Sequence, residues 1–100
     1  MTVLTMTKLR PGGEEEWDRA MRERFDSAHG RPGWISGQLM TSEDDPLIRV
    51  IVGTWRNRED WATWHDDPAF LERRSTLQRL EAEPNTTRWF SVVADARADT

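Results

Sequence analysis

The spacing of apolar residues along the chain changes several times between a period of two and a period of three to four. Four short segments are rich in β-branched or aromatic residues and are bounded by turn residues, which predicts four strands at 2–9, 34–41, 47–55 and 88–94. Between the first two strands, apolar residues recur at helical spacing, on a stripe formed by Trp17, Ala20, Met21, Phe25 and Ala28. Gly30 and Pro32 then mark the end of this helix.

A second helical region is predicted between the third and fourth strands. Asn57 is a good N-cap for a helix that carries three ring side chains on one face, namely Trp61, Trp64 and His65. Asp67 and Pro68 restart the helix, because aspartate caps a helix N-terminus and proline suits the first turn. The predicted order of elements is therefore βαββαβ.

This order predicts an α+β fold of the ferredoxin-like type, with an antiparallel sheet and two helices on one face. A length of 100 residues is enough for one core, so a single domain over residues 1–100 is expected. The third and fourth predicted strands are apolar on both sides, whereas a half-exposed strand alternates apolar and polar residues. We therefore expect a second subunit to cover the helix-free face, which makes the protein a homodimer.

Composition narrows the classes of partner and site. The formal net charge of -4 argues against nucleic acid as the main partner, because phosphate binding depends on a basic surface. Apolar runs such as 50–52 are far too short for a signal peptide or a membrane span, so a cytoplasmic protein without membrane contact is the default expectation. The chain has no cysteine, and His29 and His65 are far apart in sequence, so no metal site is predicted.

Four short motifs carry a family resemblance: Pro32-Gly33-Trp34, Gln38-Leu39-Met40, Trp55 before a charged turn, and Trp64 ahead of Asp67-Pro68-Ala69-Phe70. With them the chain resembles the antibiotic-biosynthesis-monooxygenase-like (ABM) family of the dimeric α+β barrel superfamily. Its members pack two ferredoxin-like subunits sheet against sheet. The family includes oxygenases that act on polyketide anthrones with dioxygen alone, quinol oxygenases, haem-degrading monooxygenases and members without known activity.

The resemblance implies different site residues for different branches. In the polyketide oxygenases that the chain resembles, the site has four residues: an asparagine, a tryptophan, a tyrosine and an arginine. Trp55 and Arg74 match two of these positions, whereas the asparagine falls on Ile51 and the tyrosine on Trp61. The tryptophan of the haem degraders matches Trp64, but the position of their iron-binding histidine is Arg73 or Arg74. Haem degradation by that route is therefore not expected.

The resemblance thus predicts a monooxygenase that acts with dioxygen, and without a metal or flavin cofactor, on a small aromatic molecule of polyketide or quinol type. Arg74 would stabilise the substrate anion and His65 would act as the base, with Trp55 as the third catalytic residue. The predicted substrate-binding residues are Trp61, Trp64, Phe70, Trp34 and Arg73.

Simpler readings of the same residues stay open. Tryptophans at helical spacing are more often core than pocket residues, and for Trp17 and Trp89 the core reading is preferred. His65 could be an ordinary half-buried polar residue, and Arg73 or Arg74 could pair with an acidic side chain. The missing asparagine and tyrosine favour the alternative function, a non-catalytic dimeric module that binds a hydrophobic aromatic ligand.

Overall fold

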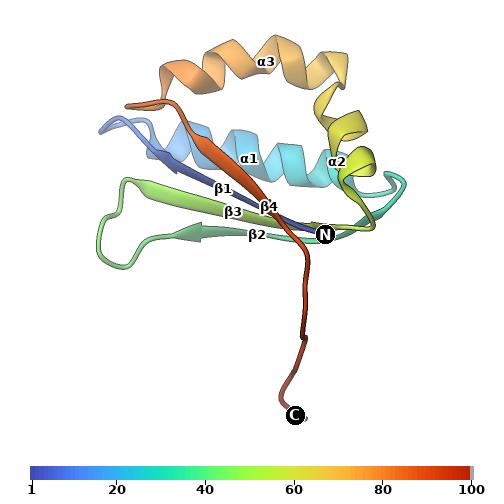
Figure 1. Cartoon of the computed structure of the whole chain (residues 1–100). Coiled ribbons are helices and arrows are strands. Elements are labelled where there is room, and N and C mark those ends of the chain that lie inside the picture. Colours follow the sequence, from blue (N-terminus) through green and yellow to red (C-terminus); the bar gives the residue numbers. More distant parts are fainter. Residues whose placement is uncertain (100) are drawn as a thin grey trace.

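The computed structural model describes residues 1–99 and forms one four-stranded antiparallel sheet with helices on one of its faces (Figure 1). The elements are β1 (Thr2–Lys8), α1 (Glu14–Ala28), β2 (Trp34–Thr41), β3 (Ile48–Trp55), α2 (Arg58–His65), α3 (Pro68–Arg79) and β4 (Thr86–Phe90). The strand order in the sheet is β2-β3-β1-β4. This arrangement confirms the predicted α+β, ferredoxin-like fold.

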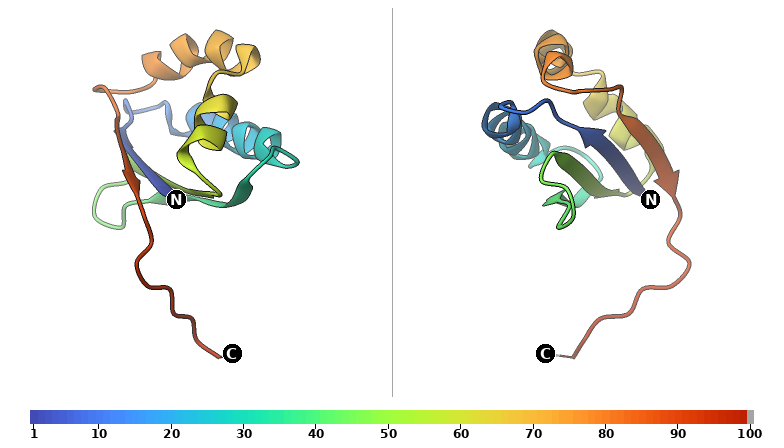
Figure 2. Two further views of the ribbon diagram at one scale, coloured as in Figure 1. Left: turned by 45° about the vertical axis from the view of Figure 1, so that its right-hand side comes forward. Right: turned by 90° about the vertical axis from the view of Figure 1, so that its left-hand side faces the viewer.

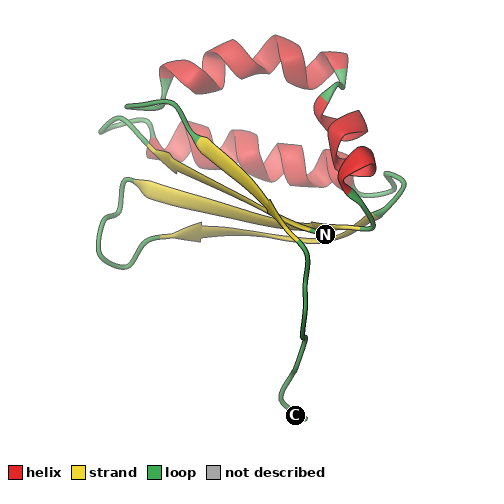
Figure 3. Ribbon diagram, viewed as in Figure 1, coloured by secondary structure: helices red, strands yellow, loops and turns green. Residues whose placement is uncertain are grey.

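The second helical region consists of two helices, so that three helices cover the sheet where two were expected (Figure 3). α2 ends at His65, and the Asp67 side chain then accepts a hydrogen bond of 3.3 Å from the backbone N–H of Ala69. Pro68 occupies the first turn of α3, where its missing N–H has no helical partner. The chain turns sharply at this junction, and α3 therefore runs in a different direction from α2 (Figure 1).

The last strand begins and ends earlier than the sequence predicts. The prediction of a strand at 88–94 was wrong in both bounds, because β4 runs from Thr86 to Phe90. Phe90 pairs with Thr2, the first residue of β1, so no strand residue remains for the following segment to pair with. Residues 91–99 lead away from the sheet without regular structure (Figure 2), and the Val93 side chain is 99% exposed.

α1 lies directly on the sheet, whereas α3 stands farther from it (Figures 1 and 2). The core accordingly forms two clusters. One joins Leu9 to Trp17 and Met21 of α1 and to Leu77 of α3, and the other consists of Val3, Ala28, Trp55 and Trp64. Between these clusters the small side chains of Thr5 and Thr7 point from β1 toward the helices. Small residues under a distant helix leave space for a cavity.

The centre of the helix-free face of the sheet is apolar, and polar residues such as Gln38 of β2 and Arg88 of β4 flank it on the neighbouring strands. Leu4 and Met6 of β1 pair with Val52 and Val50 of β3, and because side chains alternate along a strand, all four lie on this face. Met6 is 45% exposed and Phe90, at the edge of the same face, is 48% exposed. No helix in the described part of the chain has both the length and the apolar character to cross a membrane.

Candidate functional site

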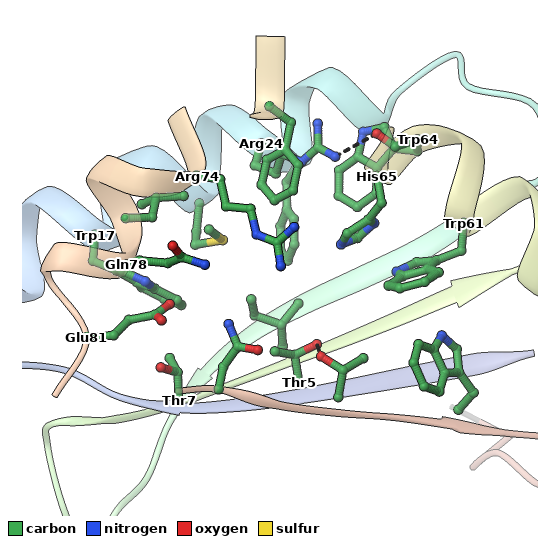
Figure 4. Close-up of a pocket in the computed structure, with 18 residues that line it drawn as sticks. Thr5, Thr7, Trp17, Arg24, Trp61, Trp64, His65, Arg74, Gln78 and Glu81 are labelled. Carbon is green, nitrogen blue, oxygen red and sulfur yellow. Dashed lines mark hydrogen bonds between the residues drawn. The ribbon is translucent and has the colours of Figure 1, made fainter. Parts of the chain in front are cut away.

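A cavity of about 270 Å³ lies between the sheet and the three helices (Figure 4). Every helix and three of the four strands contribute to its lining, which includes Thr5 and Thr7 of β1, Ile51 of β3, Trp89 of β4, Trp17, Met21 and Arg24 of α1, Trp61, Trp64 and His65 of α2, and Phe70, Arg74, Leu77 and Gln78 of α3. Most of the aromatic side chains gather at one end, and polar side chains gather near Trp17 at the other (Figure 4).

The aromatic end is built around Trp61 and His65, one helical turn apart on α2. Their ring centroids lie 4.0 Å apart, and Trp61 also meets Trp89 edge to face at 5.2 Å. Phe70 approaches His65 at 5.3 Å from the start of α3. The placement of Trp61, His65 and Phe70 in one cavity agrees with the sequence prediction. Trp89, which the sequence assigned to the core, also lines this cavity.

Arg74 points its guanidinium group into the middle of the cavity (Figure 4). Among the described residues it makes no ion pair within 4 Å. Its neighbour Arg73 lies on the outside of α3, where its guanidinium pairs with Glu23 at 2.6 Å and the side chain is 66% exposed. A rotation of about 100° per residue separates the two arginines on the helix. Arg73, predicted to bind substrate, therefore lies outside the cavity.

His65 lies in the cavity as expected, but its environment disfavours a positive charge. Burial, followed by the positive charge of Arg24, lowers the pKa of His65 to about 4. Its Nδ1 atom is buried and has no hydrogen-bond partner among the described residues. The imidazole is therefore neutral near pH 7 and is a weak proton acceptor. The pKa thus argues against the general-base role that the sequence analysis gave to His65.

Arg24 is a buried cation that the sequence analysis missed. Its side chain is 8% exposed, and Nη2 donates a 2.8 Å hydrogen bond to the backbone carbonyl of Trp64. The guanidinium carbon lies 3.6 Å from the ring centroid of Trp64 and 3.8 Å from that of Phe70, while Nη1 is 3.6 Å from Asp67. Burial lowers the pKa of Arg24 to about 10, so it stays charged near pH 7. The signal was present, because position 24 falls within the apolar stripe of α1.

Three further predicted site residues are tryptophans with different surroundings. Trp64 is 8% exposed, lines the cavity with its ring and donates an Nε1 hydrogen bond of 3.2 Å to Ser27. Trp55 is 1% exposed and packs against Trp64 in the core, with 5.3 Å between ring centroids. Trp34 packs against His29 at the start of β2. Trp55 and Trp34 are not among the residues that line the cavity.

The polar end of the cavity carries residues that periodicity alone could not identify. Thr7, Gln78, Glu81 and Asn85 gather there, and Glu81 and Asn85 belong to the connection between α3 and β4. Glu81 is only 9% exposed, and burial raises the pKa of its carboxyl group above the ordinary value. Residues 1–99 contain no cluster of three or more acidic, histidine or cysteine side chains that could hold a metal ion.

The chain matches one protein family and several solved structures. The family model described as "Antibiotic biosynthesis monooxygenase" matches residues 1–74. A Nitrosomonas europaea protein assigned to the antibiotic biosynthesis monooxygenases has 21% sequence identity and a TM-score of 0.85, covering 92% of this chain and 88% of its own. Rv0793 from Mycobacterium tuberculosis has 18% identity and a TM-score of 0.84, with 96% and 97% covered.

SnoaB from Streptomyces nogalater, described as a cofactor-independent oxygenase and solved as a point mutant, has 16% identity and a TM-score of 0.80. The match covers 94% of this chain and 93% of SnoaB. No curated protein gives a significant match to the chain. At these identities the solved structures establish the fold.

Proposed function

Because the chain belongs to the antibiotic biosynthesis monooxygenase family, we propose that it is a monooxygenase that uses dioxygen on a small aromatic compound of polyketide or quinol type, without metal or flavin. The observation that carries the proposal is the placement of Arg74. A guanidinium group without an ion-pair partner in residues 1–99 projects into a cavity that has indole rings at one end. Such a cavity suits a flat substrate that becomes an anion.

The chemistry depends on that anion. An anthrone or hydroquinone reacts with dioxygen much more readily once it has lost a proton, because the anion can transfer an electron to oxygen. A fixed positive charge beside apolar walls stabilises the developing negative charge more strongly than it would in bulk water. Arg74 is placed to supply that charge, and Arg24 adds a second, buried cation at the aromatic end.

The shape and size of the cavity favour a compact substrate. Its volume of about 270 Å³ lies just below the usual range of about 300–1,000 Å³ for ligand pockets. Trp61 and Trp89 meet edge to face and offer apolar surface to an aromatic ring. We therefore propose a substrate of two or three fused rings. The description of SnoaB as a cofactor-independent oxygenase supports the reaction type by analogy of fold.

The test is oxygen uptake by the purified protein with anthrones and naphthohydroquinones, with no added cofactor and with autoxidation subtracted. Saturable uptake is expected, and Arg74→Ala should abolish it while leaving the fold intact. Arg73→Ala is the matched control, because it removes the same charge from the next residue, outside the cavity. Equal losses in both variants, or no loss in Arg74→Ala, would remove Arg74 from the mechanism. No uptake above background with any compound would contradict the oxygenase proposal.

One observation favours the second candidate function, binding without catalysis. Ile51 and Trp61 stand where the resemblance expects asparagine and tyrosine, and both line the cavity. This part of the cavity is therefore apolar, which suits ligand binding but contributes no polar catalytic group. A binding module would show quenching of tryptophan fluorescence by 1,8-dihydroxyanthrone with no oxygen uptake above autoxidation. Quenching together with turnover would decide for the monooxygenase.

We also propose that the protein is a homodimer through the helix-free face of the sheet. That face presents Leu4, Met6, Val50 and Val52 to the outside, with Met6 45% exposed. Apolar side chains at the centre of a sheet face are costly to leave in water, and a second copy of the same face would cover them. The cavity lies on the opposite face, so each subunit would keep its own site.

A further inference from the structure

Glu81 carries a buried carboxyl group at the polar end of the cavity, and the proposed oxygenase mechanism so far gives it no role. The residue is 9% exposed, and its carboxyl group makes no ion pair within 4 Å in the described part of the chain. Buried glutamates are rare unless they are paired, because a carboxylate loses its hydration. An unpaired buried carboxyl group that faces a cavity is a candidate for function.

The backbone around Glu81 holds the side chain in place. Glu81 forms an isolated antiparallel bridge with Leu9, and Arg10 Nε donates a 3.1 Å hydrogen bond to the Glu81 carbonyl. The backbone N–H of Glu81 donates to the Gln78 carbonyl at 3.2 Å. These bonds tie the end of α3 to the end of β1, so the carboxyl group does not depend on a mobile loop for its position.

Two other buried polar groups at this end lack a hydrogen-bond partner among the described residues. Thr7 Oγ1 and Trp17 Nε1 are buried and form no hydrogen bond of good geometry among the described residues. The Trp17 indole and the Asn85 side chain both lie close enough to the Glu81 carboxyl group to lower its pKa, which opposes the larger effect of burial. Buried polar groups normally find partners, so Thr7 and Trp17, next to the Glu81 carboxyl group, are groups that a polar part of a ligand could satisfy.

Burial shifts the pKa values of two titratable groups of this cavity, His65 and Glu81, in opposite directions. A free imidazole is a stronger base than a free carboxylate. Here the pKa of His65 falls to about 4, whereas burial moves the pKa of Glu81 upward from its ordinary value. Arg74 acts on both groups electrostatically, and Figure 4 shows its guanidinium between them. Burial thus makes the imidazole a weaker base and the Glu81 carboxylate a stronger one, and Glu81 lies at the polar end, across the cavity from Trp61.

We infer that Glu81 is the proton acceptor of this site and takes an acidic C–H or O–H proton from an aromatic substrate whose rings lie toward Trp61 and whose anion Arg74 stabilises. This inference rests on the proposed function and adds the catalytic base that it requires. The ligand is thereby defined as a weak acid, with a flat ring system at one end and its ionisable group at the other.

An anthrone would react at its methylene carbon, which carries two protons. The Glu81 carboxylate takes a proton from the methylene carbon, and the electron pair of the broken C–H bond becomes the enolate. Dioxygen accepts these electrons and forms a C–O bond, and the proton returns from Glu81 to give a hydroperoxide. Glu81 then takes the second proton of that carbon as the O–O bond breaks. The carbon becomes a carbonyl, and the released hydroxide takes the proton as water. The methylene group and one dioxygen thus yield one carbonyl and one water.

The first arm of the test measures turnover of 1,8-dihydroxyanthrone by Glu81→Gln, which keeps the shape and removes the base. The expected loss in kcat is about 100-fold to 10,000-fold, the usual contribution of a general base, with a small change in KM and loss of the acidic limb of the pH profile. Glu83→Gln is the matched control, because Glu83 is exposed two residues away. An unchanged kcat and pH profile in Glu81→Gln would overturn the inference even if the protein is an oxygenase.

The second arm works without turnover and uses 1,2-dihydroxyanthraquinone, which changes from yellow to red when it ionises. At a pH where the free dye is neutral, the wild-type protein should bind the red anion without releasing a proton to the buffer, because Glu81 keeps it. Glu81→Gln should bind the yellow neutral dye or release about one proton per dye bound. This result supports the inference even if no oxygen uptake is found. A neutral dye on the wild-type protein, or identical behaviour of the two proteins, would overturn it.

Discussion

The guanidinium group of Arg24 stacks 3.6 Å above the ring of Trp64 and at the same time donates a 2.8 Å hydrogen bond to the backbone carbonyl of Trp64. One side chain of α1 thereby fixes both the ring and the backbone of α2 at its end. The same group lies 3.6 Å from Asp67, the residue that caps α3. Arg24 therefore sets the position of α2 and α3, and with them the aromatic end of the cavity.

Replacing Arg24 should destabilise the fold. We expect Arg24→Ala to lower the free energy of unfolding by about 2–3 kcal/mol, because it removes a charged hydrogen bond and a buried cation–π contact. Asp67 keeps a second partner, Arg31 at 3.3 Å, which limits the loss. Arg22→Ala, at an exposed position on the same helix, should change it by less than about 0.5 kcal/mol. Urea unfolding measures the free energy of unfolding of both variants. Equal losses in the two variants would contradict the structural role of Arg24.

Stability should fall in acid partly because of His65. Its folded pKa of about 4 lies below the ordinary 6.5, so between these values the unfolded chain binds more protons than the folded one. The stabilisation is complete above pH 6.5 and is lost as the pH falls toward 4, by up to about 3 kcal/mol. His65→Phe keeps a ring but cannot titrate, and it should flatten this slope. Thermal unfolding between pH 4 and 7 gives the comparison; parallel curves would refute the prediction.

Glu81 should change the stability with pH in the opposite direction from His65. Burial raises its folded pKa, so its contribution to stability is present at low pH and is lost as the pH rises through the folded pKa. At pH 7 the buried carboxylate is a net cost, and Glu81→Gln should therefore raise the melting temperature while it lowers turnover. Glu83→Gln, at an exposed position, should change neither. A lower melting temperature of Glu81→Gln at pH 7 would indicate that the carboxylate stabilises the fold instead.

The turn before β2 depends on Gly33. Its φ of +82° is unfavourable for other residues, and an added Cβ would collide with the Asp60 carboxylate, which Arg56 holds at 2.8 Å. Gly30 has a similar φ of +81°, but a Cβ there would meet no atom within 4 Å. Gly30→Ala should cost about 1–2 kcal/mol from backbone conformation alone, and Gly33→Ala a further ~1–3 kcal/mol from the collision. Chemical denaturation of the two variants isolates the contribution of Asp60.

If the protein is the proposed dimer, a charge placed on the helix-free face should lower its mass in solution without changing its fold. Light scattering should give about twice the chain mass of 11.7 kDa, and Met6→Glu should give the monomer mass because it places a charge on the helix-free face. Leu71→Glu is the control, since Leu71 is 48% exposed on α3 and far from that face. A monomeric wild-type protein would refute the proposal, as would a Met6→Glu variant that stays dimeric.

The sequence by itself determined the order of elements and the side of each helix that is buried. Hydrophobic spacing depends on the period of the local backbone, so the stripe with Trp17 and Met21 is readable without tertiary information, as are the capping residues Asn57 and Asp67. The helical spacing of Trp61 and His65, together with the family resemblance of Arg74, placed these three residues in one site, and all of them line the cavity.

Only the tertiary structure decided how the cavity is completed. Whether an arginine faces inward depends on the rotation of α3 relative to the sheet, which separates Arg74 from Arg73 although they are neighbours in sequence. Glu81 reaches the cavity through its bridge to Leu9, a contact between opposite ends of the chain that no local pattern encodes. Proton affinities likewise depend on burial and on distant charges. For this reason the sequence pointed to His65 as the base, whereas we infer Glu81 from its burial and its place in the cavity.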